Sequence, residues 1–446
     1  MQQQIDDLRA EVSDLRDRLN RDSSNSSVPP SADPPHAKPA PSRAPSGKRK
    51  GGQPGHPRAV RPLLPPDIIH HLKPKHCRRC RHHLGGTDPD PLVHQVHEIP
   101  AVRPSVTEYR RHRLACSHCA AVTCAELPVG VASGYGPRAQ AVCALLSGAC
   151  RLGKRMVSQI CNDLFGLSIG PAAACDLPYK TARALEPVVA GVHADLAGKP
   201  ANVDETGWRE GGKRAWLWVA VTAGVAAFVI RRSRARKVLG ELIPGVPGVL
   251  TTDRYPVYDH FEADRRQVCR AHLRRDFQAM IDRGNDGRPI GEQLLAHADA
   301  LLGLWKRVRD GTLTRRGFRS HHLIGLRAAI HVLLRRGREC RCAKTAGVCR
   351  ELLALGSALY TFADVEGVEP TNNAAERALR HAVCWRKTSY GTDSDRGSRF
   401  VERVLTVLAS CRQQGRSVLA FFTDAILAAR NGMPAPSLIK APLATP

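Results

Sequence analysis

The sequence lacks any apolar segment long enough to cross a lipid bilayer. Its most apolar stretch, residues 215–230, has sixteen residues and includes glycine and threonine, whereas a spanning helix needs about 20 apolar residues. The first residues alternate apolar and charged positions, unlike the uninterrupted apolar run of a secretory signal. We therefore expect a cytoplasmic protein with no membrane partner, in which residues 215–230 form buried strands.

Acidic residues are scarce relative to basic ones. Lys and Arg number 67 against 41 Asp and Glu, which gives a formal net charge of +26. The resulting field attracts polyanions over a Debye length of roughly 8 Å. Nucleic acid is the expected partner, although an anionic membrane surface or ribosomal RNA would accept the same charge.

A fully paired set of cysteines is also missing, because the chain has 15 of them. An odd number in a basic chain without a secretory signal argues against a disulfide framework and favours reduced thiols or a metal site. A chain of 446 residues is long enough for two or three domains, each with its own core.

Apolar residues near the N-terminus recur at spacings of three and four, which predicts a parallel two-stranded coiled coil over residues 1–22. The residues that carry the pattern are Ile5, Leu8, Val12, Leu15 and Leu19. Such a coiled coil would make the protein a homo-oligomer. The alternative is a short amphipathic helix packed on its own domain, because isolated helices of this length are marginal.

The next segment, residues 23–66, is rich in Pro, Ser, Gly, Lys and Arg. This composition cannot bury a core and predicts a basic disordered linker. Lys48, Arg49 and Lys50 lie within it and are candidate contacts to DNA phosphates. A solvated linker without a DNA contact would have the same composition.

Two Cys-x2-Cys pairs predict a zinc ribbon over residues 67–130, with strand-like runs at 92–99 and 106–114. The pairs are Cys77 with Cys80 and Cys116 with Cys119. Four thiolates leave no open position on Zn²⁺, so the ion would be structural. The alternatives are four unconnected reduced cysteines, or a site in which one ligand is replaced by His76, His82, His118 or Cys124.

Residues 131–192 are predicted to be helical, with apolar stretches at 139–149 and 157–165 and a third helix after Pro171. A glycine-containing turn at 166–168 lies between two of these helices, and basic residues are close by. The segment is therefore either a helix-turn-helix DNA reader or a plain helical packing domain.

From residue 201 the pattern changes to short strands separated by glycine turns. The expected strands are 201–208, 215–222, 226–231 and 249–252, with a helix at 235–242 before the last of them. This β-β-β-α-β order predicts an α/β ribonuclease-H-like domain, in which the first and fourth strands lie side by side. Each of these two strands carries an aspartate.

The two aspartates are Asp204, inside the first strand, and Asp253, at the end of the fourth. An aspartate in an apolar strand is costly to bury unless it is paired or binds a cation. Strand alternation turns the neighbouring Glu205 to the other face of the sheet. Asp253 could instead initiate a turn, and Asp259 is a further carboxylate that could compete for the same role.

A third carboxylate, Glu376, stands where a loop with Asn372 and Asn373 enters a helix. Asn373 and Glu376 have the spacing of a capping box, so Glu376 could merely complete a helix N-terminus. The alternative is a catalytic role, which the nearby Arg377 and Arg380 favour because guanidinium groups suit phosphate.

The order of several short blocks resembles that of the transposases of the insertion sequence 66 family. The blocks are Gly51–His56, the two Cys pairs, Tyr135–Pro137, Leu164–Gly166, Val203–Trp208, Asp253–Tyr258, Cys269–Arg275 and Thr371–Arg380. Each block alone is unspecific, but the combination covers nearly the whole chain. Thr371 stands where the family usually has Asp, and the sequence after Lys387 follows the family pattern only loosely.

The resemblance implies a DNA transposase with a leucine zipper, a zinc-binding domain and a DDE catalytic domain. The catalytic domain would span residues 193–400, with a helical insertion at about 277–364, and a C-terminal helical segment and tail would follow over 401–446. Asp204, Asp253 and Glu376 would hold two Mg²⁺ ions, or Mn²⁺, for cleavage and strand transfer. Cys269, His272, Asn372 and Asn373 would support this site, although Cys269 could be a plain buried residue beside a solvated basic helix.

The same resemblance implies that the protein binds the ends of its element and target DNA near the nucleoid of a bacterium. Candidate DNA contacts in the catalytic domain are Arg274, Arg275, Arg377, Arg380 and Lys387. Small accessory proteins of the same element would be further partners. Two other functions fit parts of the sequence, namely a zinc-ribbon DNA-binding protein and a ribonuclease-H-like nuclease without strand transfer.

Overall fold

The computed structural model describes residues 61–131, 134–245 and 247–439, together with residues 4, 12, 20–22, 26–28 and 55. The chain forms two compact units, residues 38–103 and the remainder of the chain. The coiled coil predicted for residues 1–22 and most of the linker, including Lys48, Arg49 and Lys50, lie outside the described residues. None of the described helices is long and apolar enough to cross a bilayer.

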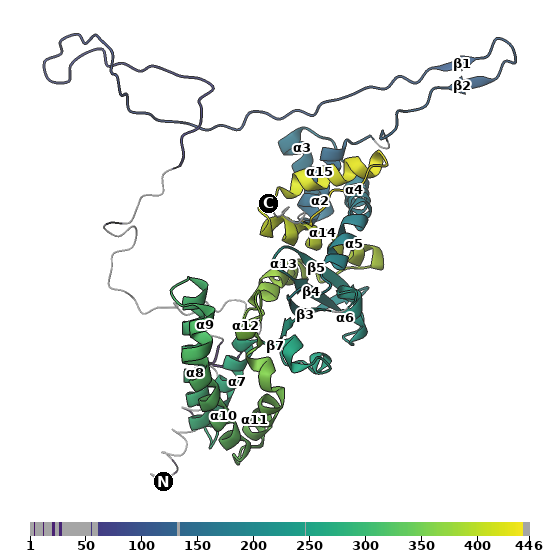
Figure 1. The fold of residues 1–446 in the computed structure, drawn as a ribbon. Coiled ribbons are helices and arrows are strands. Elements are labelled where there is room, and N and C mark those ends of the chain that lie inside the picture. Colours follow the sequence, from purple (N-terminus) through teal and green to yellow (C-terminus); the bar gives the residue numbers. More distant parts are fainter. Residues whose placement is uncertain are drawn as a thin grey trace, which may run out of the picture. The chain divides into compact units, whose positions relative to one another are not determined.

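A five-stranded sheet forms the centre of the larger unit (Figure 1). Its elements in chain order are β3 (Ala201–Glu210), β4 (Lys213–Val221), β5 (Ala226–Arg231), α6 (Lys237–Leu242), β6 (Leu250–Thr252) and β7 (Arg266–Val268). In space the strands are ordered β5-β4-β3-β6-β7. The first three pair antiparallel, and β6 pairs parallel with both β3 and β7. The predicted β-β-β-α-β order and the adjacency of its first and fourth strands are confirmed.

The apolar run at residues 215–230 forms β4 and β5, and Leu217, Trp218 and Phe228 are among its buried side chains. A strand that is covered on both faces needs apolar residues at successive positions, which explains why the run does not alternate. Gly211 and Gly212 join β3 to β4 with positive φ angles of 55° and 72°, as a two-residue hairpin turn requires.

The outer edge of β5 is covered by helix α14 (Asp395–Gln413). The backbone N–H groups of Ala226, Phe228 and Ile230 donate to side chains of this helix. The acceptors are Ser410, Thr406 and Glu402, which are spaced by four residues and therefore lie on one helix face. This edge, which would otherwise present unpaired donors, is sealed by side chains.

Further helices of the larger unit come before β3 or after residue 372 in the chain. They are α2 (Pro137–Gly148), α3 (Lys154–Phe165), α4 (Pro171–Ala184), α5 (Glu186–Asp195), α13 (Asn373–Ser389), α14 and α15 (Val418–Arg430). The first three lie where the sequence predicted helices. Helices α2, α4, α5, α13, α14 and α15 contribute to the same apolar core as β3, β4 and β5.

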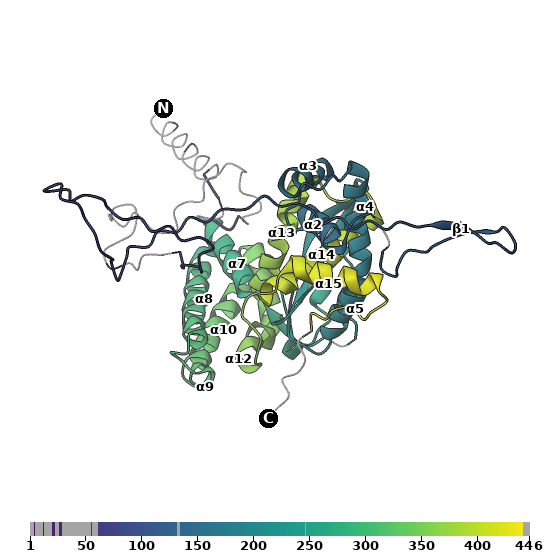
Figure 2. The same ribbon diagram turned by 90° about the horizontal axis from the view of Figure 1, so that it is seen from above.

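A second group of helices lies between β7 and α13 in the chain and has an apolar core of its own (Figures 1 and 2). It comprises α7 (Arg270–Asp282), α8 (Arg288–Arg309), α9 (Arg315–Gly317), η3 (Phe318–Leu323), α10 (Ile324–Arg338), α11 (Ala343–Leu355), η4 (Gly356–Leu359) and α12 (Thr361–Asp364). Trp305 packs edge-on against Phe362 with ring centroids 4.7 Å apart. The predicted helical insertion is present, although its first helix begins at Arg270 rather than at residue 277.

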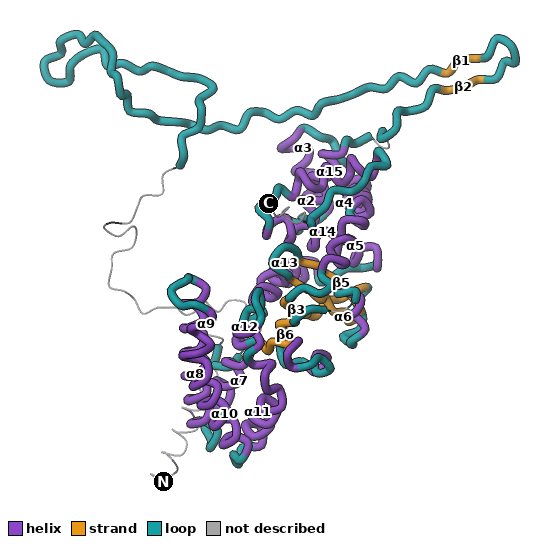
Figure 3. The backbone as a smooth tube through the Cα atoms, viewed as in Figure 1, coloured by secondary structure: helices purple, strands orange, loops and turns teal. Residues whose placement is uncertain are grey.

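Most of residues 61–131 is loop, as the tube in Figure 3 shows. The strands within this segment are β1 (Arg113–Ala115) and β2 (Val122–Cys124), which form a short antiparallel hairpin. The strand predicted for residues 92–99 is wrong, and that for 106–114 survives only at its end. Leu92 and Ile99 are exposed, so their alternation has no packed face on which a strand could form.

Candidate active site

The parallel pairing of β3 and β6 determines where the two predicted aspartates lie. Ala201 is opposite Leu250 and Asn202 is opposite Thr251. Continuing this register by two residues aligns Asp204 with Asp253, which directly follows the end of β6. The two residues therefore stand where the two strands part, although 49 positions separate them in the chain.

Asp204 is largely buried and carries the clearest electrostatic signature of the site. Burial and, to a smaller extent, the negative charges of Glu205, Asp253 and Glu376 together raise the pKa of its carboxyl group to about 8. The backbone N–H of Glu205 donates to Asp204 Oδ1 at 2.9 Å and opposes the shift. Because Glu376 contributes to this pKa, its carboxylate lies within electrostatic reach of Asp204.

Asp253 initiates a turn, which the sequence analysis gave as an alternative to a catalytic role. The backbone N–H of Tyr255 donates to Asp253 Oδ1 at 2.9 Å, which is the local bond that aspartate makes at the start of a turn. This bond holds the side chain beside Asp204 and uses one of its two oxygens. The turn and a role in the site are therefore compatible.

Glu376 lies in the first turn of α13 and does not cap the helix. Asn372 is the residue that precedes the helix, and no side chain makes a capping hydrogen bond there. The capping-box interpretation is therefore wrong. Glu376 Oε1 lies 4.0 Å from His272 Nε2 and 3.9 Å from an Nη atom of Arg275, and its side chain is 41% exposed.

Two helix starts that are far apart in sequence meet at this point. The N–H of Arg270, at the start of α7, donates to the C=O of Pro370 at 2.8 Å. The N–H of Asn372 donates to the sulfur of Cys269 at 3.3 Å. These bonds close the chain around the helical insertion, so that His272 on α7 and Glu376 on α13 become neighbours.

The residues predicted to support the site differ in their surroundings. Burial raises the pKa of the Cys269 thiol to about 11, so the group stays protonated. Burial and the charge of Arg275 lower the pKa of His272, and its buried Nδ1 atom has no hydrogen-bond partner among the residues described. Asn372 is fully buried, and neither polar atom of its side chain has a hydrogen-bond partner in the described part of the chain, whereas Asn373 is exposed.

The helix behind Cys269 is less solvated than the sequence suggested. Arg270 is 1% exposed and donates to the C=O of Leu359, so the interpretation of a solvated basic helix is wrong at this position. Arg274 is paired with Asp299. Arg377, Arg380 and Lys387 of α13 are exposed.

Glu205 has partners that the sequence did not reveal. Its side chain is buried and accepts hydrogen bonds from Arg234 and, at 2.8 Å, from the hydroxyl of Tyr258. Burial and the charge of Asp253 raise the pKa of Glu205, while Arg234 opposes the shift. Glu205 and Asp204 therefore have different hydrogen-bond partners, and the basic run at residues 231–236 was the available signal for Arg234.

The two Cys-x2-Cys pairs each adopt the same local turn. The N–H of Arg81 donates to the C=O of Cys77, and the N–H of Ala120 donates to the C=O of Cys116. Arg81 and Ala120 have positive φ angles of 65° and 58°. Backbone N–H groups of the following residues lower the pKa of the thiols of Cys77 and Cys116, which favours the thiolate form that binds metals.

Within the part of the chain that the structure describes, no three His, Cys, Asp or Glu side chains are gathered closely enough to hold a metal ion. The first Cys pair belongs to the unit of residues 38–103 and the second to the larger unit. Asp253 and Glu376 act electrostatically on Asp204, but these three described carboxylates are not drawn together to ligand distances.

Comparison of the amino-acid sequence with known proteins identifies the family of the chain. A sequence profile described as "Transposase IS66 family" matches residues 136–399, which include all strands of the large sheet, the helical insertion and α13. The match covers more than half of the chain. The chain belongs to the IS66 transposase family. The resemblance inferred from the sequence blocks is confirmed, and IS66 transposases are proteins of insertion sequences.

Two further similarities extend this finding. Residues 1–62 match a second family, DUF6444, whose function is unknown. An uncharacterized protein named y4qI from Sinorhizobium fredii is 24% identical to the chain over 248 residues. The alignment covers 50% of this chain and 45% of y4qI, so the chain spans less than half the length of this relative.

Proposed function

We propose that this IS66 family protein is an insertion-sequence transposase that binds the ends of its element and cuts and joins DNA with divalent metal ions. Its catalytic residues would be Asp204, Asp253 and Glu376, in a ribonuclease-H-like domain. The observation that carries the proposal is the register of β3 and β6, which aligns the two aspartates, together with the influence of Glu376 on the pKa of Asp204.

The side chains suit hard divalent cations. Mg²⁺ and Mn²⁺ prefer oxygen ligands, and the three carboxylates supply them. Burial and the negative charges of nearby carboxylates raise the pKa of Asp204, and a bound cation would favour the charged carboxylate by displacing the proton. When bound, a pair of such ions would activate the attacking oxygen and stabilise the leaving oxygen of a phosphodiester.

The chain's own residues would prepare the site. His272 is neutral because its pKa is lowered, so its Nε2 atom is available to orient Glu376 from 4.0 Å. Cys269 remains a thiol and ties the start of α13 to α7 through Asn372. Arg275, Arg377 and Arg380, which belong to the N-terminal halves of α7 and α13, would hold DNA phosphates beside the carboxylates.

The N-terminal part would serve assembly and DNA binding. We propose that Cys77, Cys80, Cys116 and Cys119 bind a structural Zn²⁺ ion, since each pair has the turn and the lowered thiol pKa that suit a metal ligand. The coiled coil of residues 1–22 would join copies of the chain. Accessory proteins of the same element, a location at the nucleoid and the helix-turn-helix role of residues 131–192 are further parts of this proposal.

The experiment uses a labelled DNA fragment that carries an end of the element, and a supercoiled plasmid as target. Cleavage and joining are scored separately for the wild type and for Glu376→Gln, with Mg²⁺, with Mn²⁺ and with a chelator. Glu376→Gln should lower both rates by roughly 1,000-fold or more, because a carboxylate ligand is lost, and should leave DNA binding intact. Glu366→Gln, at an exposed carboxylate in the loop before α13, is the matched control and should act as the wild type does.

Three outcomes would contradict the proposal in different ways. Cleavage and joining at the wild-type rate by Glu376→Gln would remove this residue from the catalytic set. Cleavage without joining by the wild type would indicate a nuclease. Binding without either reaction would indicate a zinc-containing DNA-binding protein.

A further inference from the structure

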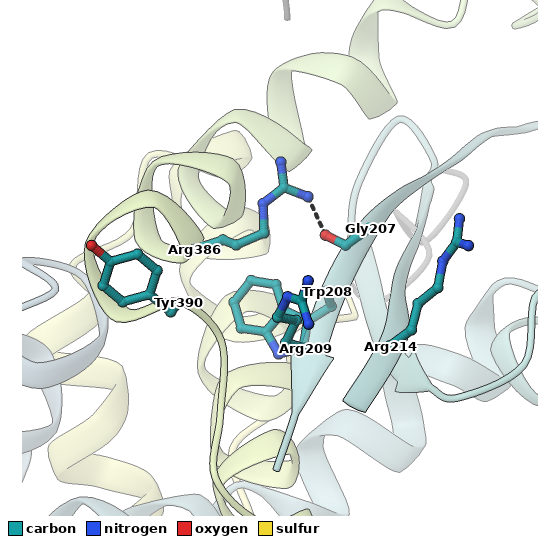
Figure 4. A pocket seen from close by; sticks show the side chains of 6 residues that line it. All are labelled: Gly207, Trp208, Arg209, Arg214, Arg386 and Tyr390. Atoms are coloured by element: carbon teal, nitrogen blue, oxygen red, sulfur yellow. Dashed lines mark hydrogen bonds between the residues drawn. The ribbon is translucent and has the colours of Figure 1, made fainter. Parts of the chain in front are cut away.

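A pocket lies between the C-terminal end of α13 and the part of β3 that runs past the end of β6. Its volume is about 550 Å³. The residues that line it are Gly207, Trp208, Arg209, Arg214, Arg386 and Tyr390. Figure 4 shows Arg386 and Tyr390 on the helix side of the pocket and the other four residues on the two strands.

The lining contains three guanidinium groups and no carboxylate. Arg209 donates to the C=O of Gly212, and Arg214 lies over the ring of Trp216 at 4.8 Å. Arg386 donates to the hydroxyl of Thr206 and to the C=O of Gly207. None of the three makes an ion pair with a carboxylate in the described part of the chain.

Neighbouring arginines of the same domain behave differently. Arg231, Arg232 and Arg234 are each paired with a glutamate, namely Glu402, Glu210 and Glu205. Among the residues that the structure describes, the arginines beside the pocket therefore lack the counter-ions that their neighbours have. Uncompensated positive charges around a concave surface favour an anionic ligand, and guanidinium groups suit phosphate in particular.

Tyr390 is held at the rim of the pocket in an uncommon backbone conformation. It ends α13 with a φ of 60° and is 79% exposed. The next residues are fixed to β3, because the N–H of Thr392 donates to the C=O of Arg209 at 2.9 Å, and Thr392 accepts the N–H of Gly211 at 2.8 Å. The Tyr390 ring is therefore exposed on a loop that is fixed to β3, and it stands at a backbone conformation that few residues other than glycine adopt.

The pocket lies close to the proposed catalytic carboxylates. Gly207 follows Asp204 on β3 by three residues, which corresponds to roughly 10 Å at the rise of a strand. A DNA strand whose scissile phosphate lies at Asp204 would reach the pocket within a few nucleotides.

We propose that this pocket binds one unpaired nucleotide of the DNA strand beside the scissile phosphate. The base would stack on Tyr390, and Arg209 and Arg214 would hold the adjacent phosphates. An exposed aromatic ring next to cationic side chains is the combination that binds single-stranded DNA, whereas a base inside a duplex has no free face for stacking. The choice of DNA as ligand rests on the proposed function.

The test uses the full chain and a single-stranded DNA oligonucleotide with one 2-aminopurine, whose fluorescence is quenched when the base stacks on an aromatic ring. Wild type and Tyr390→Phe should quench the probe, and Tyr390→Leu should lose the quenching and bind about tenfold more weakly. Arg214→Ala should also bind about tenfold more weakly and lower the salt dependence of binding by about one charge. Arg335→Ala, at an exposed arginine of α10, is the matched control and should change neither quantity.

The result that overturns the proposal is quenching by a folded Tyr390→Leu variant that equals that of the wild type. Circular dichroism and thermal unfolding of each variant establish that it is folded. Glu376→Gln distinguishes nucleotide binding in the pocket from catalysis. The variant should quench the probe as the wild type does, although it should not cut or join DNA. If the probe is bound at Tyr390 but no variant or wild type cuts DNA, the pocket stands and the catalytic proposal fails.

Discussion

The unpaired backbone groups on the outer edge of β5 and on the part of β3 beyond its pairing with β6 are satisfied in different ways. On β5 the N–H groups are satisfied by Ser410, Thr406 and Glu402 from α14, and the region is buried. On β3 the groups beyond residue 202 are satisfied by Asp204, Arg386 and Thr392, and the surroundings are partly open to solvent.

The difference shows how one sheet can contain both a rigid side and a reactive side. The β5 edge uses side chains that are themselves buried, so each hydrogen bond stabilises the fold. The β3 edge uses the ionisable side chains of Asp204 and Arg386 and the backbone of Thr392, and the second oxygen of Asp204 takes part in none of these bonds. Carboxylate and guanidinium groups with unused acceptor or donor atoms can bind a substrate only where the sheet edge stays accessible.

The largest expected effect comes from opening the sealed edge with Glu402→Leu. The change removes the acceptor for the N–H of Ile230 and the buried partner of Arg231 and Arg399. Loss of one partner of a buried charged network should lower the free energy of unfolding by roughly 2 to 4 kcal/mol. Urea denaturation followed by circular dichroism measures it, and a loss below about 0.5 kcal/mol would mean that α14 does not seal β5 through Glu402.

A smaller effect should follow from crowding the open edge with Gly391→Ala. Gly391 has a φ of 120°, and a Cβ atom there would lie 2.3 Å from the C=O oxygen of Arg209. The loop should move away from β3 at a cost of about 1 to 3 kcal/mol, and quenching of the 2-aminopurine probe should fall as Tyr390 moves.

The matched control for this change is Gly240→Ala in α6, where a Cβ atom would meet no atom within 4 Å. There the alanine should be neutral or stabilise the helix by up to about 1 kcal/mol. Equal unfolding free energies for the two alanine variants would contradict the tight contact between residue 391 and β3.

The smallest effect concerns pH and the sealed edge. Burial raises the pKa of Glu402 from an ordinary value of 4.5 to about 7. The folded chain therefore keeps a proton that the unfolded chain has lost, and this group's contribution to stability falls as pH rises from about 4.5 to 7.

Glu402→Gln should remove that dependence, because glutamine keeps an oxygen acceptor for Ile230 but does not titrate. We expect the difference in unfolding free energy between wild type and variant to change by roughly 1 to 2 kcal/mol across this range. Unfolding curves at several pH values measure it, and two parallel pH profiles would show that the carboxyl group is not perturbed.

The elements of the sheet could be predicted because their signals are local. Apolar runs separated by glycine turns gave β3, β4 and β5 nearly at their observed bounds, and the chain order of the elements follows from them. The prediction of a strand at residues 92–99 was wrong because a strand also needs a packing partner, which a local pattern does not reveal. Its alternation is real, but no packing partner is present in the described part of that unit to make one face buried.

The candidate site could be predicted in its acidic residues but not in its surroundings. Asp204 and Asp253 stand out because polar residues are rare in or beside apolar strands. The hydrogen bond of Tyr258 to Glu205 and the contact of Cys269 with Asn372 join residues that have no common sequence pattern. The same holds for the pocket at Tyr390, whose exposure depends on how the loop after α13 is fixed to β3.

The sequence alone determined the family, the positive charge, the strand and helix order and the three candidate carboxylates, because each depends on residue type and short-range spacing. Only the tertiary structure decided that Glu376 turns toward His272 and Arg275 rather than capping its helix. It also decided that three arginines beside Tyr390 have no carboxylate partner among the described residues. These outcomes depend on contacts between segments about one hundred or more residues apart, and such contacts form only when the sheet and both helix starts are in place.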